Sequence, residues 1–357
     1  MISVAPSHSR ALNGYRAGLA LLALTVAALV FLSLFLGAQS LSAGVIFRAL
    51  FLPTTCGDPH ECDTVRYVVF QLRLPRSLVA LGTGIALAVA GVVLQALWRN
   101  PLADAGVLGV STAAALGAAA ATYFGTFTVV GPWIPSHLHM TAGAFAVSLA
   151  TLTVLYKLAG QRGGTNLSAL LLLGIACNAI GSGVLGLFLF LSSDAQLRAL
   201  TFWTLGSAAG ANWLVAASLW SGILTLAPIL YRLRTALDVL LLGEHNAFYL
   251  GFKPARVQRV ALVSVALLLA LAIAATGPVA FVGLIVPHTL RLLTGAQHRT
   301  LLPLASLAGG LFVLASDLCA RTLASPAELP LSLVTASAGG PALLLFLKLN
   351  SSPEHWR

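Results

Sequence analysis

Ten apolar segments, most of them long enough for a helix to cross a bilayer, constrain this chain more than any other feature. They lie at about 17–37, 75–97, 107–130, 139–159, 167–191, 212–231, 260–276, 279–294, 301–320 and 331–349. Only 8% of the residues are charged, whereas a soluble domain has roughly 25%. The pattern excludes an ordinary soluble enzyme and a disordered protein. It predicts an all-α polytopic membrane protein with about ten transmembrane helices.

The segments are rich in Leu, Ala and Gly and lack two-residue alternation, which favours helices over an outer-membrane barrel. The segment at 279–294 is short and contains Pro287, so a broken or re-entrant span is expected there. The first segment is longer than the apolar part of a signal peptide and is interpreted as a retained span. Eight and twelve spans are the alternative counts.

The basic residues set the orientation. With the N-terminus inside, these are the arginines on the outer side: Arg48, Arg66, Arg73, Arg76, Arg198 and Arg321. The rest of the 20 Lys and Arg residues fall on the inner side, as the positive-inside rule requires. Both termini are therefore predicted to be cytoplasmic. The same distribution accounts for the net charge of +10 without a nucleic-acid partner.

The predicted organisation is one transmembrane domain over 17–349, between cytoplasmic termini at 1–16 and 350–357. A periplasmic loop is expected at about 38–74 and a cytoplasmic loop at about 232–259.

Motifs for catalysis are missing from the sequence. It has no phosphate-binding loop, no zinc-protease helix and no serine elbow, so this chain is predicted to be non-catalytic. Asp317 is the main carboxylate within an apolar segment, and it lies one helical turn from Arg321, which favours an ion pair at the helix end. A secondary transporter that works without an ATPase is the alternative of a different class. Such carriers usually place carboxylates near the bilayer centre, and these are scarce here.

Cys56 and Cys62 flank a Gly-Asp-Pro-His-Glu turn in the outer loop. In an oxidising periplasm, such spacing favours a disulfide. A metal site that uses the intervening His and Glu is the alternative, and no metal is assigned. Cys177 and Cys319 lie in apolar segments and are interpreted as small buried side chains.

Two segments suggest close packing and a gate. Gly84 and Gly91 lie on one face of their helix, which allows close contact with other helices. Asn100-Pro101 ends that helix at the inner face. Because irregular backbone at membrane depth should line a water-accessible path, we assign Asn100, Pro101 and Leu102 to a cytoplasmic gate.

The inner loop at 232–259 has Gly243-Glu-His-Asn-Ala-Phe-Tyr-Leu-Gly251 at its centre. Its first turn is polar at Glu244 and it is apolar at Ala247, Phe248 and Leu250. A short helix of this kind suits docking to a cytosolic partner, or it lies on the membrane surface; composition alone does not separate the two.

Four motifs occur in a fixed order: Arg-Leu-Pro-Arg at 73–76, Asn-Pro-Leu-Ala-Asp at 100–104, Phe-Val-Gly-Leu-Ile-Val-Pro-His at 281–288 and Glu-Leu-Pro at 328–330. Together they resemble the permease subunits of ABC importers for iron-siderophore, haem and cobalamin, the FecCD-type family. The resemblance covers about residues 66–349. It implies a fold like that of the cobalamin-importer permeases, in the bacterial inner membrane.

The resemblance also implies partners. The subunit would work as a homodimer with the pathway at the dimer interface. Two cytosolic ATP-binding-cassette subunits would carry ATP and Mg, and a periplasmic binding protein would deliver substrate. No cofactor is expected on this chain.

By the same resemblance, Arg73, Arg76 and Arg321 are expected to pair with acidic residues of the binding protein. The alternatives are snorkelling to the interface and local ion pairing. The segment Gly243–Gly251 matches the coupling helix that fits the ATPase.

The chain departs from the family at three places. It has Asp104-Ala105-Gly106 in place of Asp-Pro-Gly, Leu331-Ser332 where a Gly usually follows Glu-Leu-Pro, and Gly339-Gly340-Pro341 in place of Gly-Ala-Pro. These departures question local geometry more than function.

The substrate is suggested by the Leu-Arg-x-Leu-Thr-Phe-Trp sequence at 197–203, which looks like the haem-importing branch. Arg198 can pair with a propionate, and Phe202 and Trp203 offer flat surfaces to a porphyrin. The alternative roles are a snorkelling charge and an interface anchor. A ferric siderophore and cobalamin are the alternative substrates. His137 and His139 are interpreted as loop residues rather than iron ligands.

Overall fold

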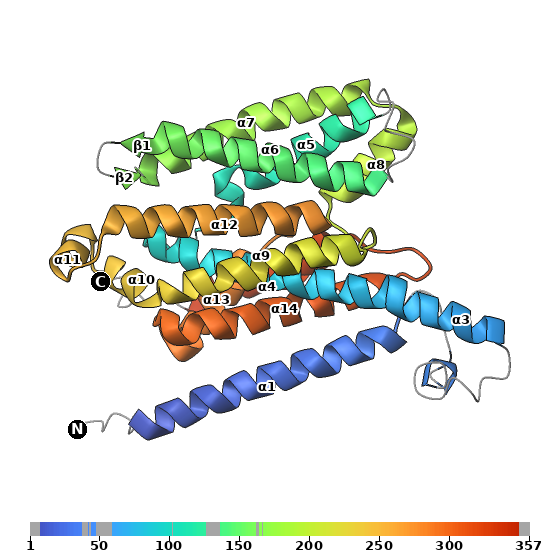
Figure 1. Ribbon diagram of the computed structural model, residues 1–357, viewed down its shortest axis with the longest axis horizontal. Helices are drawn as coiled ribbons and strands as arrows, with labels where there is room; N and C mark the ends of the chain where they lie inside the picture. The colour runs from blue at the N-terminus through green and yellow to red at the C-terminus, as the bar shows by residue number, and fades with distance from the viewer. Residues whose placement is uncertain are drawn as a thin grey trace.

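The computed structural model is a bundle of long, roughly aligned helices (Figure 1). It describes residues 8–37, 42, 44–47, 59–101, 103–125, 136–161, 164–165 and 167–349. The helices of the first half are α1 (His8–Phe35), α3 (Pro59–Tyr67), η2 (Val68–Arg73), α4 (Leu74–Leu97), η3 (Ala105–Leu108), α5 (Val110–Gly125), α6 (Ser136–Ala159) and α7 (Leu167–Leu191). A short antiparallel pair, β1 (Gly160–Gln161) with β2 (Gly164–Thr165), joins α6 to α7.

The second half is helical in the same way. Its helices are α8 (Asp194–Thr204), α9 (Trp213–Arg232), α10 (Arg234–Leu240), α11 (Glu244–Tyr249), α12 (Pro254–Thr276), α13 (Val282–Thr294), α14 (His298–Thr322) and α15 (Leu331–Leu349). The N-terminal end of α1 and the short helix α11 lie at the same end of the bundle, on the left of Figure 1. This end is the predicted cytoplasmic side, and we call it the inner end.

Each predicted apolar segment corresponds to one apolar helix. In the described residues, 7 helices are long and apolar enough to cross a membrane, and shorter apolar helices occur at Val110–Phe124, Val282–Thr294 and Leu331–Leu345. The prediction of an all-α polytopic membrane protein is confirmed.

Part of the predicted outer loop is helical. Residues 59–73, within the loop expected at about 38–74, form α3 and η2 and continue into α4. The helix extends outward because Cys62, Val65 and Val69 are buried against Ile46 in a separate apolar cluster. This packing gives the extension a core of its own.

Two glycines let α4 approach its neighbours closely. A Cβ added at Gly84 would collide with the carbonyl oxygen of Gly309 on α14, and one added at Gly91 would collide with that of Gly283 on α13. The predicted role of Gly84 and Gly91 in close helix contact is confirmed. Helix α4 is buried along nearly its whole length, so it forms the centre of the bundle.

Helix α13 is short, with 13 residues, and it starts after an irregular segment. Gly277 has a φ of 71° and Phe281 a φ of 67°, so the chain bends sharply before the helix begins. Two backbone carbonyls here accept hydrogen bonds from other segments: Ser207 N donates to Thr276 O at 2.7 Å, and Ser332 Oγ of α15 donates to Pro278 O at 2.7 Å. The broken span predicted at 279–294 is present.

Candidate functional sites at the two ends of the bundle

An ion-pair cluster at the outer end is centred on Asp317. Arg76 donates from Nη2 to Asp317 Oδ1 at 2.8 Å, and from Nε to Oδ1 and Oδ2 at 3.0 and 3.2 Å. Its Nη1 donates to Glu328 Oε1 at 2.7 Å. Asp317 is buried, with its side chain 1% exposed. Charge-assisted bonds in this bidentate form are among the strongest polar contacts in proteins, so Arg76 is held firmly.

Arg321 is the second cation of this cluster. Its Nε lies 3.6 Å from Asp317 Oδ2, and its side chain is 3% exposed. The ion pair predicted from the i, i+4 spacing is therefore present. The structure adds Arg76, which makes the shorter contacts to the same carboxylate. Arg321 Nε and Nη2 are buried and make no hydrogen bond within the described residues.

Arg73 is anchored differently. Its Nη1 donates to the carbonyl oxygens of Leu34 and Phe35, at the end of α1, at 2.8 and 2.9 Å. A guanidinium is well suited to satisfying two of the carbonyls that a helix C-terminus leaves without partners. Arg73 thereby ties α1 to η2.

A hollow of about 250 Å³ joins the predicted docking arginines. Arg73, Arg76, Arg321 and Glu328 all line it. The structure therefore brings the three arginines together at the outer end. Each of them also has a contact within this chain, so docking of the binding protein stays a prediction.

Helix α8 carries the predicted substrate-pathway residues. Ser193 caps its N-terminus in a capping box with Gln196. Arg198 and Phe202 are one turn apart and exposed, Phe202 at 61%, so they share one face of the helix. Trp203 instead packs against the core. The structure brings Arg198 and Phe202 together but turns Trp203 away from them.

The predicted cytoplasmic gate begins where α4 ends. Arg99 has a φ of 50°, Asn100 N donates to Gln95 O at 3.1 Å, and Ala103 N donates to Asn100 O at 3.1 Å. The chain therefore reverses at Asn100-Pro101, as the helix break predicts. Leu102 lies outside the described residues.

A contact that the sequence did not indicate lies next to this turn. Arg291 Nη2 of α13 donates to Gln95 Oε1 at 3.2 Å. Gln95 is fully buried, so α13 is fixed to the last turn of α4. Two side chains 196 positions apart give no local pattern from which their contact could be predicted.

The inner end carries the predicted coupling helix, α11. Gly243 and Gly251 bound it, with φ values of 107° and 86°, where a Cβ would be strained. Glu244 accepts a hydrogen bond from Gln258 Nε2 at 2.8 Å. Ala247 is fully buried, so it packs against this chain and does not present an apolar surface. Leu250 is 61% exposed.

The exposed residues of this segment include two aromatic side chains. Phe248 and Tyr249 are 67% and 83% exposed. Tyr249 was not assigned from the sequence, although it sits between Phe248 and Leu250 in the segment bounded by glycines. Large apolar side chains that gather at a surface mark a site of contact with another protein or with a membrane. We call Phe248, Tyr249 and Leu250 the coupling face.

The segment before α11 has its own anchor, which the sequence analysis also missed. His298 is buried at the start of α14, and both its backbone N and its Nδ1 contact Asp238 Oδ1 of α10, at 3.0 and 2.6 Å. Asp238 thereby caps α14 and ties α10 to it.

The cysteines agree only in part with the sequence-based interpretation. Cys62 is disulfide-bonded, whereas its predicted partner, Cys56, lies outside the described residues. Cys177 is partly buried and Cys319 is exposed, so the burial predicted for Cys319 is wrong. Cys319 is exposed because it does not lie on the face of α14 that packs into the bundle. In the described part of the chain, no group of three His, Cys, Asp or Glu residues could hold a metal ion.

Comparisons with known proteins agree with this architecture. The FecCD transport family matches residues 24–348. The hemin transport system permease protein HmuU of Yersinia pestis is 40% identical over 316 residues, which cover 87% of this chain and 88% of that protein. The cobalamin import system permease protein BtuC of Halobacterium salinarum is 34% identical over 311 residues, which cover 86% and 80%.

A molybdate permease and a solved transporter structure are also similar to this chain. The molybdate import system permease protein MolB of Haemophilus influenzae is 34% identical over 312 residues, which cover 87% of this chain and 89% of that protein. Molybdate was not among the substrates considered from the sequence. A solved structure described as an inward-facing conformation of a metal-chelate type ABC transporter has a TM-score of 0.79 and 32% identity, covering 93% of this chain and 98% of that one.

The similarity runs from within α1 to the end of α15 and so includes both ends of the bundle. A family assignment from one motif would leave most of the helices unexplained, but here the whole membrane part is matched. The chain therefore belongs to the FecCD transport family and is a membrane-spanning permease of an ABC importer.

Proposed function

We propose that this permease carries haem across the bacterial inner membrane as a homodimer of single transmembrane domains. Two cytosolic ATPase subunits drive it, and a periplasmic binding protein delivers the substrate. The permease itself neither hydrolyses ATP nor holds a cofactor.

The observation that carries the haem assignment is the exposed face of α8. Arg198 and Phe202 lie side by side at the outer end, and a flat, dianionic, largely apolar ligand needs both a cation and an aromatic surface. In a symmetric dimer the face occurs twice, which gives one arginine for each propionate. The 40% identity to a hemin permease supports the same substrate.

The proposed ATPase contact is the coupling face of α11. A helix fixed by the buried Ala247 and by the bond between Glu244 and Gln258 presents its aromatic residues in a set orientation. A rigid anchor of this kind transmits motion between subunits better than a mobile loop would.

A ferric siderophore or cobalamin is the alternative substrate, since a cobalamin permease is 34% identical. The test is transport in vesicles that hold the permease, its ATPase and its binding protein. We expect ATP-dependent uptake of haem and little uptake of a ferric siderophore, cobalamin or molybdate. Uptake of one of these in preference to haem would replace the assignment. Uptake without the ATPase would overturn the proposed mechanism.

A further inference from the structure

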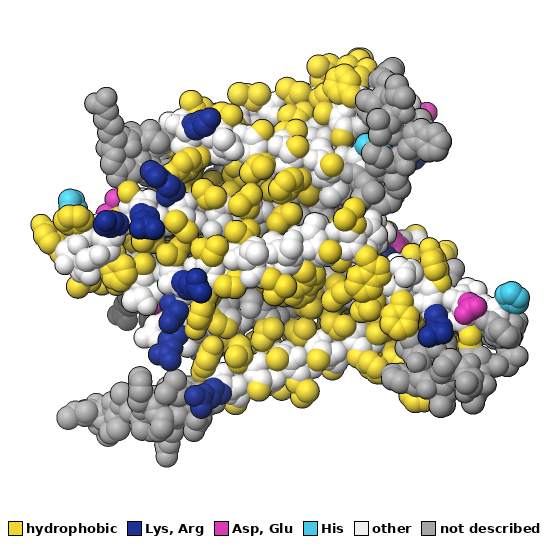
Figure 2. All heavy atoms as spheres, in the orientation of Figure 1, with side chains coloured by type: hydrophobic (Ala, Val, Ile, Leu, Met, Phe, Trp, Pro, Cys, Tyr) yellow, Lys and Arg dark blue, Asp and Glu magenta, His cyan; other side chains and the backbone are white. Residues whose placement is uncertain are grey.

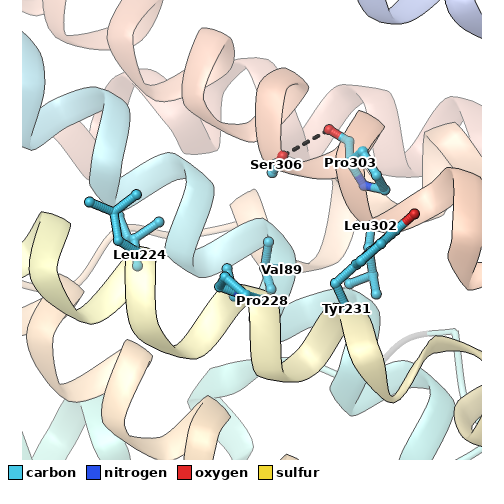
Figure 3. Close-up of a pocket in the computed structure, with 9 residues that line it drawn as sticks. Val89, Leu224, Pro228, Tyr231, Leu302, Pro303 and Ser306 are labelled. Carbon is cyan, nitrogen blue, oxygen red and sulfur yellow. Dashed lines mark hydrogen bonds between the residues drawn. The ribbon is translucent and has the colours of Figure 1, made fainter.

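A hollow of about 340 Å³ opens between α4, α9 and α14 near the inner end of the bundle (Figure 3). Its walls include Val89 of α4, Leu224, Pro228 and Tyr231 of α9, and Leu302 and Pro303 of α14. We call it the inner groove. The Ser306 hydroxyl on its wall donates to Pro303 O at 2.8 Å, so it is already used within α14. The groove therefore offers its occupant a mainly apolar surface.

Two prolines explain why the helices separate here. Pro228 lies inside α9 and Pro303 inside α14. Each lacks a backbone N–H and crowds the carbonyl four residues before it, at Leu224 and Arg299. Helices bend at such positions. With a proline on both facing helices, the gap is built into the backbone.

Two arginines, Arg234 and Arg299, lie next to residues that line the groove. The Arg234 guanidinium lies 4.5 Å from the centre of the Tyr231 ring, and its Nη1 donates to Tyr231 O at 3.2 Å. Arg299 is exposed on α14, one turn before Leu302. Tyr15 of α1 lies within electrostatic range of both Tyr231 and Arg299.

The arginines at the mouth have no carboxylate partner here. Among the residues that the structure describes, neither Arg234 nor Arg299 forms an ion pair. Asp238, one turn after Arg234, is already bound by His298. Figure 2 shows Lys and Arg side chains gathered at this end of the molecule, beside a surface that is mostly apolar. A negatively charged ligand would complement these cations.

We propose that the inner groove binds an anionic phospholipid of the inner leaflet. An acyl chain lies against Leu224, Pro228 and Leu302, and the phosphate sits between Arg234 and Arg299. Basic pockets between transmembrane helices on the cytoplasmic side are suited to anionic headgroups. A zwitterionic lipid can fill the apolar part but does not neutralise the arginines. The inference does not depend on which substrate is transported.

The charge half of the proposal is tested by lipid titration of the purified full-length protein, followed by native mass spectrometry. Phosphatidylglycerol and phosphatidylcholine with the same acyl chains are compared. We expect tighter binding of phosphatidylglycerol, and a loss of about fivefold in its affinity for each arginine removed in Arg234→Gln and Arg299→Gln. The matched control is the pair Arg256→Gln and Arg259→Gln, exposed residues of α12 at the same end.

Equal binding of the two lipids by the wild type would overturn the proposal. So would an equal loss in the control pair, because that result would show a general effect of net charge. Excess inorganic phosphate should not displace the lipid; displacement would identify a site for free phosphate instead.

The location is tested with a phosphatidylglycerol that carries a photoreactive acyl chain. Peptide mapping should find adducts within 224–231 and 302–306. Leu224→Trp should reduce them several-fold, and it does not disturb the core because Leu224 is 68% exposed. Adducts that map elsewhere, or that persist in this variant, would overturn the site even if anionic lipid is preferred.

Discussion

The two ends of this permease present their candidate contact residues in opposite ways. At the outer end, Asp317 and Arg321 are buried, Arg76 is largely buried, and both arginines form ion pairs with Asp317. At the inner end, Phe248 and Tyr249 are mostly exposed. The outer cluster is therefore part of the folded chain, whereas the coupling face contributes little to the chain's own core. Of the residues assigned to docking, those at the outer end therefore also stabilise the fold, whereas those at the inner end contribute little to stability.

Electrostatics explains why the outer end needs internal partners. A charge taken out of water is costly unless an opposite charge and hydrogen bonds replace its hydration. Apolar side chains at a surface carry no such penalty, so the coupling face can remain exposed in the isolated chain. Mutations should therefore separate the two ends by what they damage first, stability or assembly.

The largest effect is expected for Asp317→Ala. It leaves Arg76 and Arg321 without their shared carboxylate in a buried site, which should cost about 3–5 kcal/mol of stability. The measurement is thermal unfolding of the purified permease. Glu328→Gln is the matched control, because Glu328 is 33% exposed and its loss should cost about 1 kcal/mol or less. Equal effects of the two would contradict the description of the outer end.

The second effect concerns the inner end. Replacing Tyr249 with Asp should leave unfolding unchanged and weaken association with the ATPase about 30-fold, as expected when an interface anchor worth about 2 kcal/mol is lost. Leu323→Asp, at the outer end and 72% exposed, makes the same kind of change away from the inner surface. It should leave ATPase binding as in the wild type. A drop in stability for Tyr249→Asp would instead place this residue in the core.

The third effect concerns the proposed substrate-pathway residue of α8, at the outer end. Arg198→Ala should lower haem transport about tenfold, the value of one charge-assisted hydrogen bond of about 1.5 kcal/mol. Arg198→Lys should restore part of it, because Lys keeps the charge but lacks the planar fork. Arg66→Ala is the control, an exposed arginine of α3. Haem uptake at the wild-type rate in Arg198→Ala would remove this residue from the pathway.

The smallest effect is expected for the docking role proposed for Arg321. Arg321→Gln should weaken binding of the periplasmic protein about fivefold and make that binding less sensitive to salt. Affinity measured at two ionic strengths tests this. An unchanged salt dependence would mean that Arg321 serves only its ion pair with Asp317.

The sequence predicted the helices well because their signal is local. A run of apolar residues of membrane length identifies a span wherever it occurs, and the glycines of α4 were read from their spacing alone. It predicted the glycine-bounded coupling helix for the same reason. The inward turn of Ala247 could not be read from composition, because burial depends on α10 and α12.

Contacts between residues far apart in the sequence could not be predicted from it. Arg76 and Asp317 are 241 positions apart, and no periodicity links them. The sequence offered only the pair within one helix, Asp317 with Arg321, and the structure shows that Arg76 makes the shorter bonds. The outward extension of α4 was missed because α3 is polar and its support from Ile46 comes from a separate segment.

The short helix α13 has a consequence for biosynthesis. With 13 residues, it rises about 20 Å, less than the roughly 30 Å of a hydrocarbon core. A nascent α13 therefore cannot settle in lipid by itself and must enter together with α12 and α14. The site at which α13 packs, Gly91 of α4, is synthesised much earlier. We expect the packing around α4 at the centre of the bundle to be completed only when α13 and α14, in the last third of the chain, have been synthesised.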